Sequence, residues 1–532
     1  MSGRRAHRRS RTLAGVPSLP RRPDRLFAAL VVCAYLPVAV FAIAHHEMWR
    51  DELHCWLVAR DSPMPWDVVH NRAYDGQPPL WYLLLWLLQR VTHDPRAMQV
   101  AHVALATAVV WVFASRAPFG RPLRALFPFG YFLAYEYVAL SRCYGLALLL
   151  ALLLCDHHPR RFERPARTAL VLAALALTTT VSTVVAAAYT TVLLWDWVDL
   201  ARRRDPLARR AWIPIAAGAT AFVAAALCAW PPADSTVAHV SWPREMPDDF
   251  APTRLIVAML PVPRPYFYFW NSNALLEFEP FRRIAVPVSL ALGAWLVFVL
   301  SRRREAAVLF GVGMVGLMAL FGLVYGGDVR HHGFLFVLFV MAAWLAKQTS
   351  APPGPTRTRW TRMRDAALTP TLAVVLLAHV AGTPIALGYE YAKVFSSGGR
   401  AAEVLRARGL ERALLVAEVD YPATAVLGQL DGNPSAYSPR TGHTFSFVKW
   451  TRARAWDPSD QDTLRFAAAL GAWKGEDAVL LMNRPLLPEL IDGHAVVRIA
   501  ELYDSMIQEE NFYIYRVARN TEATRGVQPG AD

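Results

Sequence analysis

The segment HHEMWRDELHCWLVARDSPMPWDVVHNRAYDGQPPLWY, residues 45–82, is polar and rich in aromatic residues, and it lies between two strongly apolar stretches. Tryptophan and tyrosine are enriched where a membrane protein meets the interface with water. Asp51 and Glu52 stand side by side in this segment, and Asp75 and Gln77 follow near its end. A charged segment of this kind beside apolar stretches predicts a site at a membrane surface.

The composition of the whole chain is that of a helical membrane protein. Of its 532 residues 55% are hydrophobic, the mean hydropathy is +0.24, and the apolar blocks are separated by arginine clusters. Only helices satisfy their own backbone polar groups in lipid, so we expect a multi-pass helical bundle. The formal charge of +14 does not indicate a nucleic-acid partner, because the arginines recur in short loops and are typical of cytoplasmic anchors. The five cysteines form no metal-binding or disulfide pattern.

The arginine clusters set the predicted topology. Residues 1–25 carry eight arginines and form a basic cytoplasmic tail, and no cleavage site follows the apolar block 26–44, which we expect to be a retained helix. If successive apolar blocks cross the membrane in alternate directions after this helix, the chain has about eleven spans. An outer loop then lies at 45–97, with a short interfacial helix at 79–91. The expected spans are 26–44, 98–114, 125–136, 143–155, two helices within 168–198 that turn at 178–183, 212–230, 284–300, 306–325, 333–346 and 367–388.

The chain changes in kind after the last expected span. Residues 26–388 form the predicted membrane domain, whereas residues 389–520 are charged and less apolar, and 521–532 are a predicted frayed tail. Alternating helical and β-rich runs predict a small soluble α/β domain, on the outer side because the number of spans is odd. The runs are helix-like RAAEVLRARG and TLRFAAALGAWKG and strand-like ALLVAEV and AVLLM.

Under this topology, two adjacent carboxylates and a set of arginines and histidines gather at the outer ends of the helices. Such a set suits a reaction in which a hydroxyl is deprotonated while a phosphate leaves. A carboxylate serves as the general base, and guanidinium groups neutralise the departing charge. The candidates are Asp51, Glu52, Asp75, Glu136, Arg142, Asp328, Arg330, His331 and His332.

Each candidate also has an ordinary structural explanation. Asp51 and Glu52 can be first-turn carboxylates favoured by a helix dipole, and Asp75 can be the turn residue of an Asp-Gly pair. Arg142 can be an interfacial arginine that snorkels, although an arginine at an outer helix end runs against the positive-inside bias. The trio 330–332 can be structural, and its histidines could instead hold a metal, for which no second ligand spacing exists.

Four motifs resemble the GT-C glycosyltransferases, the superfamily of the protein O-mannosyltransferases and the lipid A aminoarabinose transferase, which use polyprenyl-phosphate-linked sugars. The motifs are WRDELHCWLVARDS, AYDGQPPLWYLLLW, SRCYGLALLL and DVRHHGFLFVLF. The resemblance covers about residues 26–350 and is strongest over 45–155. Relatives commonly have His-Pro or Lys-Pro where Gln77 stands here. The motifs are short and degenerate, so they indicate the superfamily and no subfamily.

The resemblance implies that Asp51 is the base for the acceptor hydroxyl and that Glu52 is its supporting neighbour. It implies that no nucleotide site is needed, because the lipid phosphate itself leaves. It also leaves room for a divalent metal. Gln77 is a poor metal ligand compared with the histidine that relatives commonly have at this position. The resemblance implies that the arginines, together with His331 or His332, neutralise the lipid phosphate. The substrate-binding residues that it implies are Asp75, Gln77, Arg142, Tyr144, Arg330, His331 and His332.

These observations predict a hexosyl- or pentosyltransferase of the bacterial inner (plasma) membrane, with a cytoplasmic N-terminus. It would move a sugar from a polyprenyl-phosphate donor to a lipid, glycan or protein acceptor at the outer face. The alternative is a transporter or flippase of lipid-linked saccharide, in which the same charges would line a pathway. A transporter predicts charges within several spans and often a repeated half, and the sequence shows neither. A third hypothesis is a non-catalytic assembly scaffold that acts through its outer domain.

Overall fold

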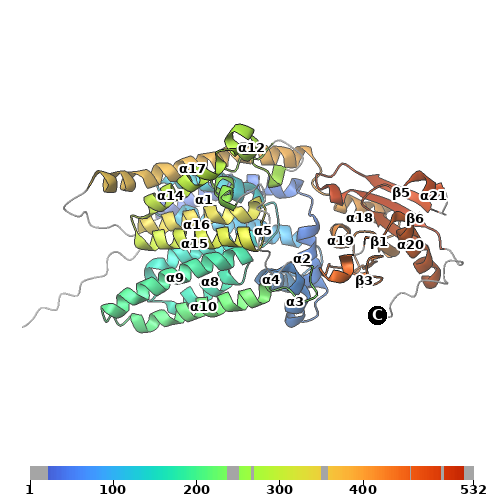
Figure 1. Cartoon of the computed structure of the whole chain (residues 1–532), viewed down its shortest axis with the longest axis horizontal. Coiled ribbons are helices and arrows are strands. Elements are labelled where there is room, and N and C mark those ends of the chain that lie inside the picture. The colour runs from blue at the N-terminus through green and yellow to red at the C-terminus, as the bar shows by residue number, and fades with distance from the viewer. Residues whose placement is uncertain are drawn as a thin grey trace, which may run out of the picture.

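The structure is a computed structural model in which residues 22–236, 251–264, 269–348, 358–455, 457–492 and 496–519 are described. Most of the predicted N-terminal tail and the whole C-terminal tail lie outside these residues. Figure 1 shows two parts, a long bundle of helices and a sheet domain at one end of it. The prediction of a polytopic helical protein with a small C-terminal α/β domain is confirmed.

Seven helices in the described residues are long and apolar enough to cross a membrane. They run side by side in Figure 1, with the shorter apolar helices α8 (Pro165–Ala176) and α14 (Ala285–Leu300) alongside them. The long helices are α1 (Arg22–His45), α5 (Arg96–Arg116), α9 (Thr180–Arg202), α10 (Ala208–Ala229), α15 (Arg304–Leu323), α16 (Val329–Gln348) and α17 (Arg359–Ala392).

The other four expected spans are short or broken. Helices α7 (Tyr144–His157), α8 and α14 have 14, 12 and 16 residues. At 1.5 Å per residue these lengths reach only about 18 to 24 Å, less than the hydrocarbon thickness of about 30 Å. The stretch expected as a helix at 125–136 is irregular, because Pro128 lacks an N–H group and cannot continue a helix. It consists of α6 (Arg121–Leu126), a 3₁₀ turn η2 (Phe127–Phe129) and a π-helical turn η3 (Phe132–Glu136).

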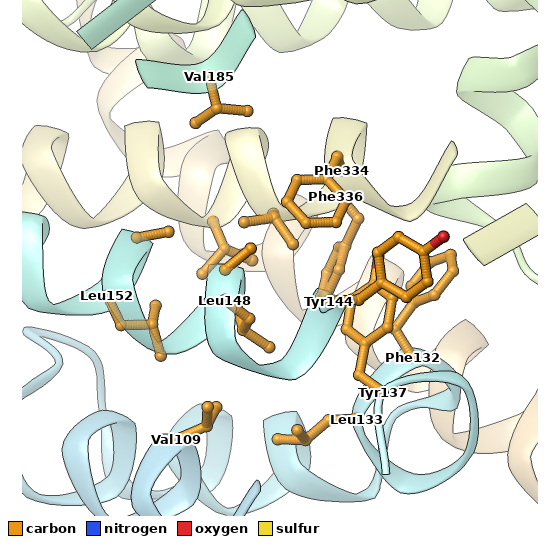
Figure 2. Packing of buried hydrophobic residues seen from close by; sticks show 14 of the residues in the cluster. Val109, Phe132, Leu133, Tyr137, Tyr144, Leu148, Leu152, Val185, Phe334 and Phe336 are labelled. Carbon is orange, nitrogen blue, oxygen red and sulfur yellow. The ribbon is translucent and has the colours of Figure 1, made fainter. Parts of the chain in front are cut away.

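The central helix of the bundle is α16, in which every residue from Val329 to Ala346 is buried. A helix that is apolar on all sides is stable only when neighbours surround it. Figure 2 shows Phe334 and Phe336 of α16 close to Tyr144 of α7, with α7 lying between α16 and α5. Gly333 allows the close approach, since a Cβ there would lie 2.3 Å from the Tyr137 hydroxyl oxygen. This packing holds the first turn of α16 next to the loop that precedes α7.

The sheet domain is a three-layer α/β unit. Its six strands have the order β3-β2-β1-β4-β6-β5, and the central strands β1 (Leu414–Ala417) and β4 (Ala478–Met482) are parallel and fully buried. Such strands are continuous apolar runs because helices cover both faces, which is why LLVA and AVLLM were readable from sequence. The other elements are α18 (Gly398–Ala407), α19 (Asp420–Leu427), β2 (Ala436–Tyr437), β3 (Thr444–Phe445), η7 (Arg452–Ala455), α20 (Asp460–Lys474), α21 (Pro488–Asp492), β5 (Val496–Leu502), η8 (Gln508–Glu510) and β6 (Phe512–Val517).

Helix α2 (Arg50–Arg60) lies between the bundle and the sheet domain, as Figure 1 shows. Leu57 is buried in the core of the sheet domain, and a Cβ at Gly428 would lie 2.8 Å from Leu53. The position of α2 therefore depends on both parts. The remaining elements are α3 (Pro65–Asn71), η1 (Arg72–Asp75), the short apolar helix α4 (Leu80–Gln89), η5 (Ala251–Thr253), α11 (Arg254–Met259), η6 (Phe269–Asn271), α12 (Ala274–Glu277) and α13 (Glu279–Arg282), with η4 (His158–Arg160) after α7.

A buried carboxyl group joins the sheet domain to α2 and predicts a pH dependence. Glu510 is fully buried and accepts the backbone N–H of Arg50 at 3.2 Å, and Ser396 donates to its other oxygen. Burial raises the pKa of Glu510 from 4.5 to about 7, although the charge of Arg50 opposes the rise. Between these values the folded protein holds a proton that the unfolded chain has lost, so stability falls as the pH rises through this window.

We therefore expect the thermal midpoint of the purified protein in detergent to fall between pH 5 and pH 8, with Glu510 contributing on the order of 1 to 3 kcal/mol. Glu510→Gln keeps the shape and cannot ionise, so the part of the slope that Glu510 contributes should disappear in the variant. An unchanged slope in Glu510→Gln would show that other groups cause it.

Candidate functional site

A cavity of about 540 Å³ lies where the helical bundle meets the sheet domain. Polar residues of the 50–82 segment form one side, the ends of α9, α10 and α15 form an apolar side, and the sheet domain closes the top. The lining residues include Arg50, Asp51, His54, Tyr74, Asp75, Gln77, Tyr82, Arg142, Val181, Ala226, Trp230, Leu320, Val324, Tyr325, Arg330, His331, Tyr421, Thr424, Val448 and Trp450.

Arg330, at the start of α16, lines the cavity and is paired with two carboxylates. Its Nη2 lies 3.0 Å from Asp51 Oδ2 and 2.6 Å from Asp328 Oδ2, and its guanidinium carbon lies 5.3 Å from the Trp49 ring centroid. The side chain is only 7% exposed, and its Nε has no hydrogen-bond partner. Arg330 therefore has donor capacity that the protein itself does not fill.

Arg142 reaches the same cavity from the loop before α7. Its Nη1 donates to the main-chain carbonyl of Asp51 and lies 3.0 Å from Cys55 Sγ, while its Nε has no partner. Within the described ranges no carboxylate oxygen is recorded within 4.0 Å of it. A guanidinium group in this condition favours an anion as ligand, because Arg binds phosphate through a planar fork.

Asp51 lines the cavity from the first turn of α2, as expected of a reacting carboxylate. Burial opposes its ionisation, but the charges of Arg330, Arg142 and Arg50 outweigh this effect and lower the pKa of Asp51. Asp51 is thus an anion between arginines at neutral pH.

Glu52, the neighbour of Asp51, is not among the cavity-lining residues. Its carboxylate is fully buried, accepts the N–H of Ser141 at 2.6 Å and lies 2.9 Å from His46 Nε2. The second nitrogen of His46 lies 2.6 Å from Glu390 on α17. Adjacent residues of a helix point about 100° apart, which is why the two carboxylates face different surroundings. Glu52 connects α2 to the loop that carries Arg142 and, through His46, to α17.

Asp75 and Gln77 both line the cavity, and each is held by neighbours. The Asp75 carboxylate lies 2.9 Å from His54 Nε2 and accepts the Tyr82 hydroxyl at 2.9 Å. Gln77 Oε1 accepts the Thr179 hydroxyl at 3.0 Å and the Thr180 N–H at 3.2 Å, so its amide group fixes the start of α9.

The remaining candidates differ in their access to the cavity. His331 lines it and lies 2.8 Å from the Tyr144 hydroxyl, so Tyr144 supports His331 from outside the lining. His332 is absent from the lining and contacts the Gly326 carbonyl at 3.0 Å. Glu136 is buried and accepts the Tyr131 hydroxyl at 2.8 Å. The described residues contain no group of three or more His, Cys, Asp or Glu side chains that could hold a metal ion.

Several lining residues were not among the sequence-based candidates. His54 could have been found, because it lies three residues after Asp51 and therefore on the same face of a helix. Arg50 was adjacent to the acidic pair and equally visible. Tyr421 and Trp450 gave no signal, since their place in the cavity depends on how the sheet domain packs on α2. Trp270, which follows residues that lie outside the described ranges, packs against Trp49.

Comparison with known proteins gives structural matches only. No protein-family model and no curated protein matches the chain. It is similar to two crystal structures of ArnT from Cupriavidus metallidurans, one bound to undecaprenyl phosphate and one in the apo state. The first is 13% identical with a TM-score of 0.48, covering 92% of this chain and 98% of that chain. The second is 12% identical with a TM-score of 0.49, covering 94% and 99%. A likeness at this level does not identify a substrate or a catalytic residue.

Proposed function

We propose that this protein is a membrane glycosyltransferase of the GT-C type that transfers a sugar from a polyprenyl-phosphate donor to an acceptor hydroxyl in the cavity. One observation carries the proposal: Arg142 and Arg330 border one cavity together with the ionised Asp51. Two guanidinium groups on one cavity suit a phosphate, and a carboxylate beside them suits the hydroxyl that attacks.

In the proposed reaction the acceptor oxygen attacks the anomeric carbon of the donor sugar. The bond between that carbon and the phosphate oxygen breaks as the new glycosidic bond forms, and the lipid phosphate leaves with the electron pair. Arg142 and Arg330 neutralise the charge that develops on the leaving phosphate. Asp51 accepts the proton of the acceptor hydroxyl.

The lining of the cavity suits two kinds of substrate. Its apolar side, formed by residues such as Val181, Ala226 and Leu320, belongs to the outer ends of α9, α10 and α15 and suits a lipid-linked donor. Its top carries Tyr421 and Trp450 of the sheet domain, and aromatic rings suit the apolar faces of an acceptor sugar. The acceptor class, whether lipid, glycan or protein, is left to experiment.

The proposed orientation has the cavity and the sheet domain outside the cytoplasmic membrane of a bacterium. The supporting observation is that the helices end in exposed arginines on the side away from the cavity, as the positive-inside rule requires of a cytoplasmic face. Helix α9, for example, begins beside the cavity at Thr180 and ends at Arg202. The exposed arginines at the turn between α9 and α10 are Arg202, Arg203, Arg204, Arg209 and Arg210.

The test is sugar transfer by the full chain in nanodiscs, with a panel of polyprenyl-phosphate sugars and extracted envelope lipids and glycans as acceptors. Transfer from one donor would support the enzyme and identify its sugar. If no donor is consumed while the same lipid moves across a liposome bilayer, the protein is a transporter of lipid-linked saccharide and the proposal is wrong.

Replacing Arg142 with glutamine should raise the KM for the donor by about 10- to 100-fold, because a charge-assisted hydrogen bond is worth roughly 1.5 to 3 kcal/mol. Initial rates over a range of donor concentrations measure this. Arg116→Gln is the matched control, since Arg116 pairs with Asp156 on the other side of the bundle and does not line the cavity. An unchanged donor KM in Arg142→Gln would remove Arg142 from the phosphate site.

A further inference from the structure

One nitrogen of Arg330 is shared by two carboxylates that come from different parts of the chain. Asp51 Oδ2 lies 3.0 Å from Arg330 Nη2, and Asp328 Oδ2 lies 2.6 Å from the same atom. Asp51 belongs to α2, whereas Asp328 directly precedes α16. The two anions thus hold the guanidinium group from separate elements.

The two carboxylates differ in their access to the cavity. Asp51 lines it, whereas Asp328 is not among the lining residues. Asp328 is also held from behind, because Asn271 Nδ2 donates to its Oδ1 at 2.9 Å and Asn271 Oδ1 accepts the Val329 N–H at 3.1 Å. Asn271 therefore fixes both the Asp328 side chain and the first turn of α16.

A phosphate that enters the cavity approaches Arg330 from the side of Asp51. Phosphate oxygens and the Asp51 carboxylate are both anions that need the same N–H donors, so they compete for this guanidinium group. Asp328 lies outside the cavity and does not meet the phosphate directly. When Asp51 is displaced, Asp328 is the carboxylate that still holds Arg330.

We propose that Asp328, held by Asn271, is a positioning residue that keeps Arg330 at the cavity wall while the donor phosphate takes the place of Asp51. This inference rests on the proposed glycosyl transfer. It has a consequence for the order of events, since Asp51 becomes free to accept a proton only after the donor has occupied Arg330. The donor therefore occupies Arg330 before proton transfer to Asp51 begins.

The test compares two substitutions that change the charge equally, Asp51→Asn and Asp328→Asn. Each removes one negative charge beside Arg330, so a general electrostatic effect would tighten phosphate binding in both variants. Competition by Asp51 predicts tighter phosphate binding in Asp51→Asn, whereas positioning by Asp328 predicts weaker phosphate binding in Asp328→Asn. Binding of undecaprenyl phosphate to the full chain in nanodiscs should tighten about tenfold in Asp51→Asn and weaken about tenfold in Asp328→Asn, each equivalent to one charge-assisted contact.

Two further variants separate positioning from loss of folding. Asn271→Ala keeps the net charge and should weaken binding in the same direction as Asp328→Asn. Asp328→Glu keeps the carboxylate and should recover part of the affinity. Inorganic phosphate is titrated in parallel. If the variants change its affinity in the same directions, the effect belongs to the phosphate group alone. If the changes are seen only with undecaprenyl phosphate, the effect belongs to the lipid-linked phosphate. Either result supports the proposal.

Three outcomes would overturn it, and they are distinguishable. If both Asp→Asn variants tighten binding, the effect is one of charge and Asp328 positions nothing. If both weaken it, Asp51 does not compete with the phosphate. If the unaltered protein binds no polyprenyl phosphate and transfers no sugar, the proposed function itself fails and the role of Asp328 fails with it.

Discussion

Asp51→Asn should lower the rate of sugar transfer by about a thousandfold or more while the protein stays folded, because the general base and the local charge are lost together. Asparagine has nearly the same shape as aspartate, so the main-chain contact between Asp51 and Arg142 can persist. What it cannot do is accept a proton from the acceptor hydroxyl. The measurement is the single-turnover rate with donor and acceptor in nanodiscs.

The matched control is Asp67→Asn, in the same segment, residues 45–82. Asp67 accepts the N–H of Met64 at the start of α3 and does not line the cavity, and asparagine can make the same cap. Its transfer rate should stay close to that of the unaltered protein. A normal rate in Asp51→Asn would exclude Asp51 as the base, and a loss in both variants would point to the segment as a whole.

Glu52→Ala should lower the free energy of unfolding by about 3 to 5 kcal/mol, the usual cost of breaking a buried ion pair. The substitution leaves the N–H of Ser141 without its acceptor and leaves His46 with only one of its two carboxylates. Thermal and denaturant unfolding of the detergent-solubilised protein would measure the loss. Glu52→Gln, which keeps an oxygen for Ser141, should lose less.

This result would separate two roles for the adjacent carboxylates. The sequence alone suggested that Asp51 and Glu52 work side by side, whereas the structure gives Glu52 contacts with the interior. If Glu52→Ala unfolds at the same temperature as the unaltered protein but transfers no sugar, Glu52 has a catalytic role after all. If it is unstable and the stable Glu52→Gln retains transfer, its role is to hold the loop before Arg142.

Local sequence features predicted the architecture well, for physical reasons that act over short distances. A helix in lipid needs a long apolar run, so α1, α5, α15 and α17 were readable directly. The buried central strands β1 and β4 were equally visible as short apolar runs. The stretch 125–136 is apolar enough to be predicted as a helix, and that prediction is wrong. Pro128 interrupts the stretch, and the buried turns η2 and η3 take the place of the helix.

The candidate site likewise combines features that are local in the sequence with contacts that depend on tertiary packing. A multi-pass helical chain, an α/β domain at its end and the polar segment that contains Asp51 are predictable from local sequence, because apolar length, charge bias and strand patterning are properties of neighbouring residues. The contact of Asp51 with Arg330, 279 residues away, and the orientation of Glu52 toward the interior depend on the packing of distant parts of the chain. The tertiary structure also decided that Trp450 closes the cavity. These contacts depend on how α2 packs between two separately folded parts, and no local pattern encodes that packing.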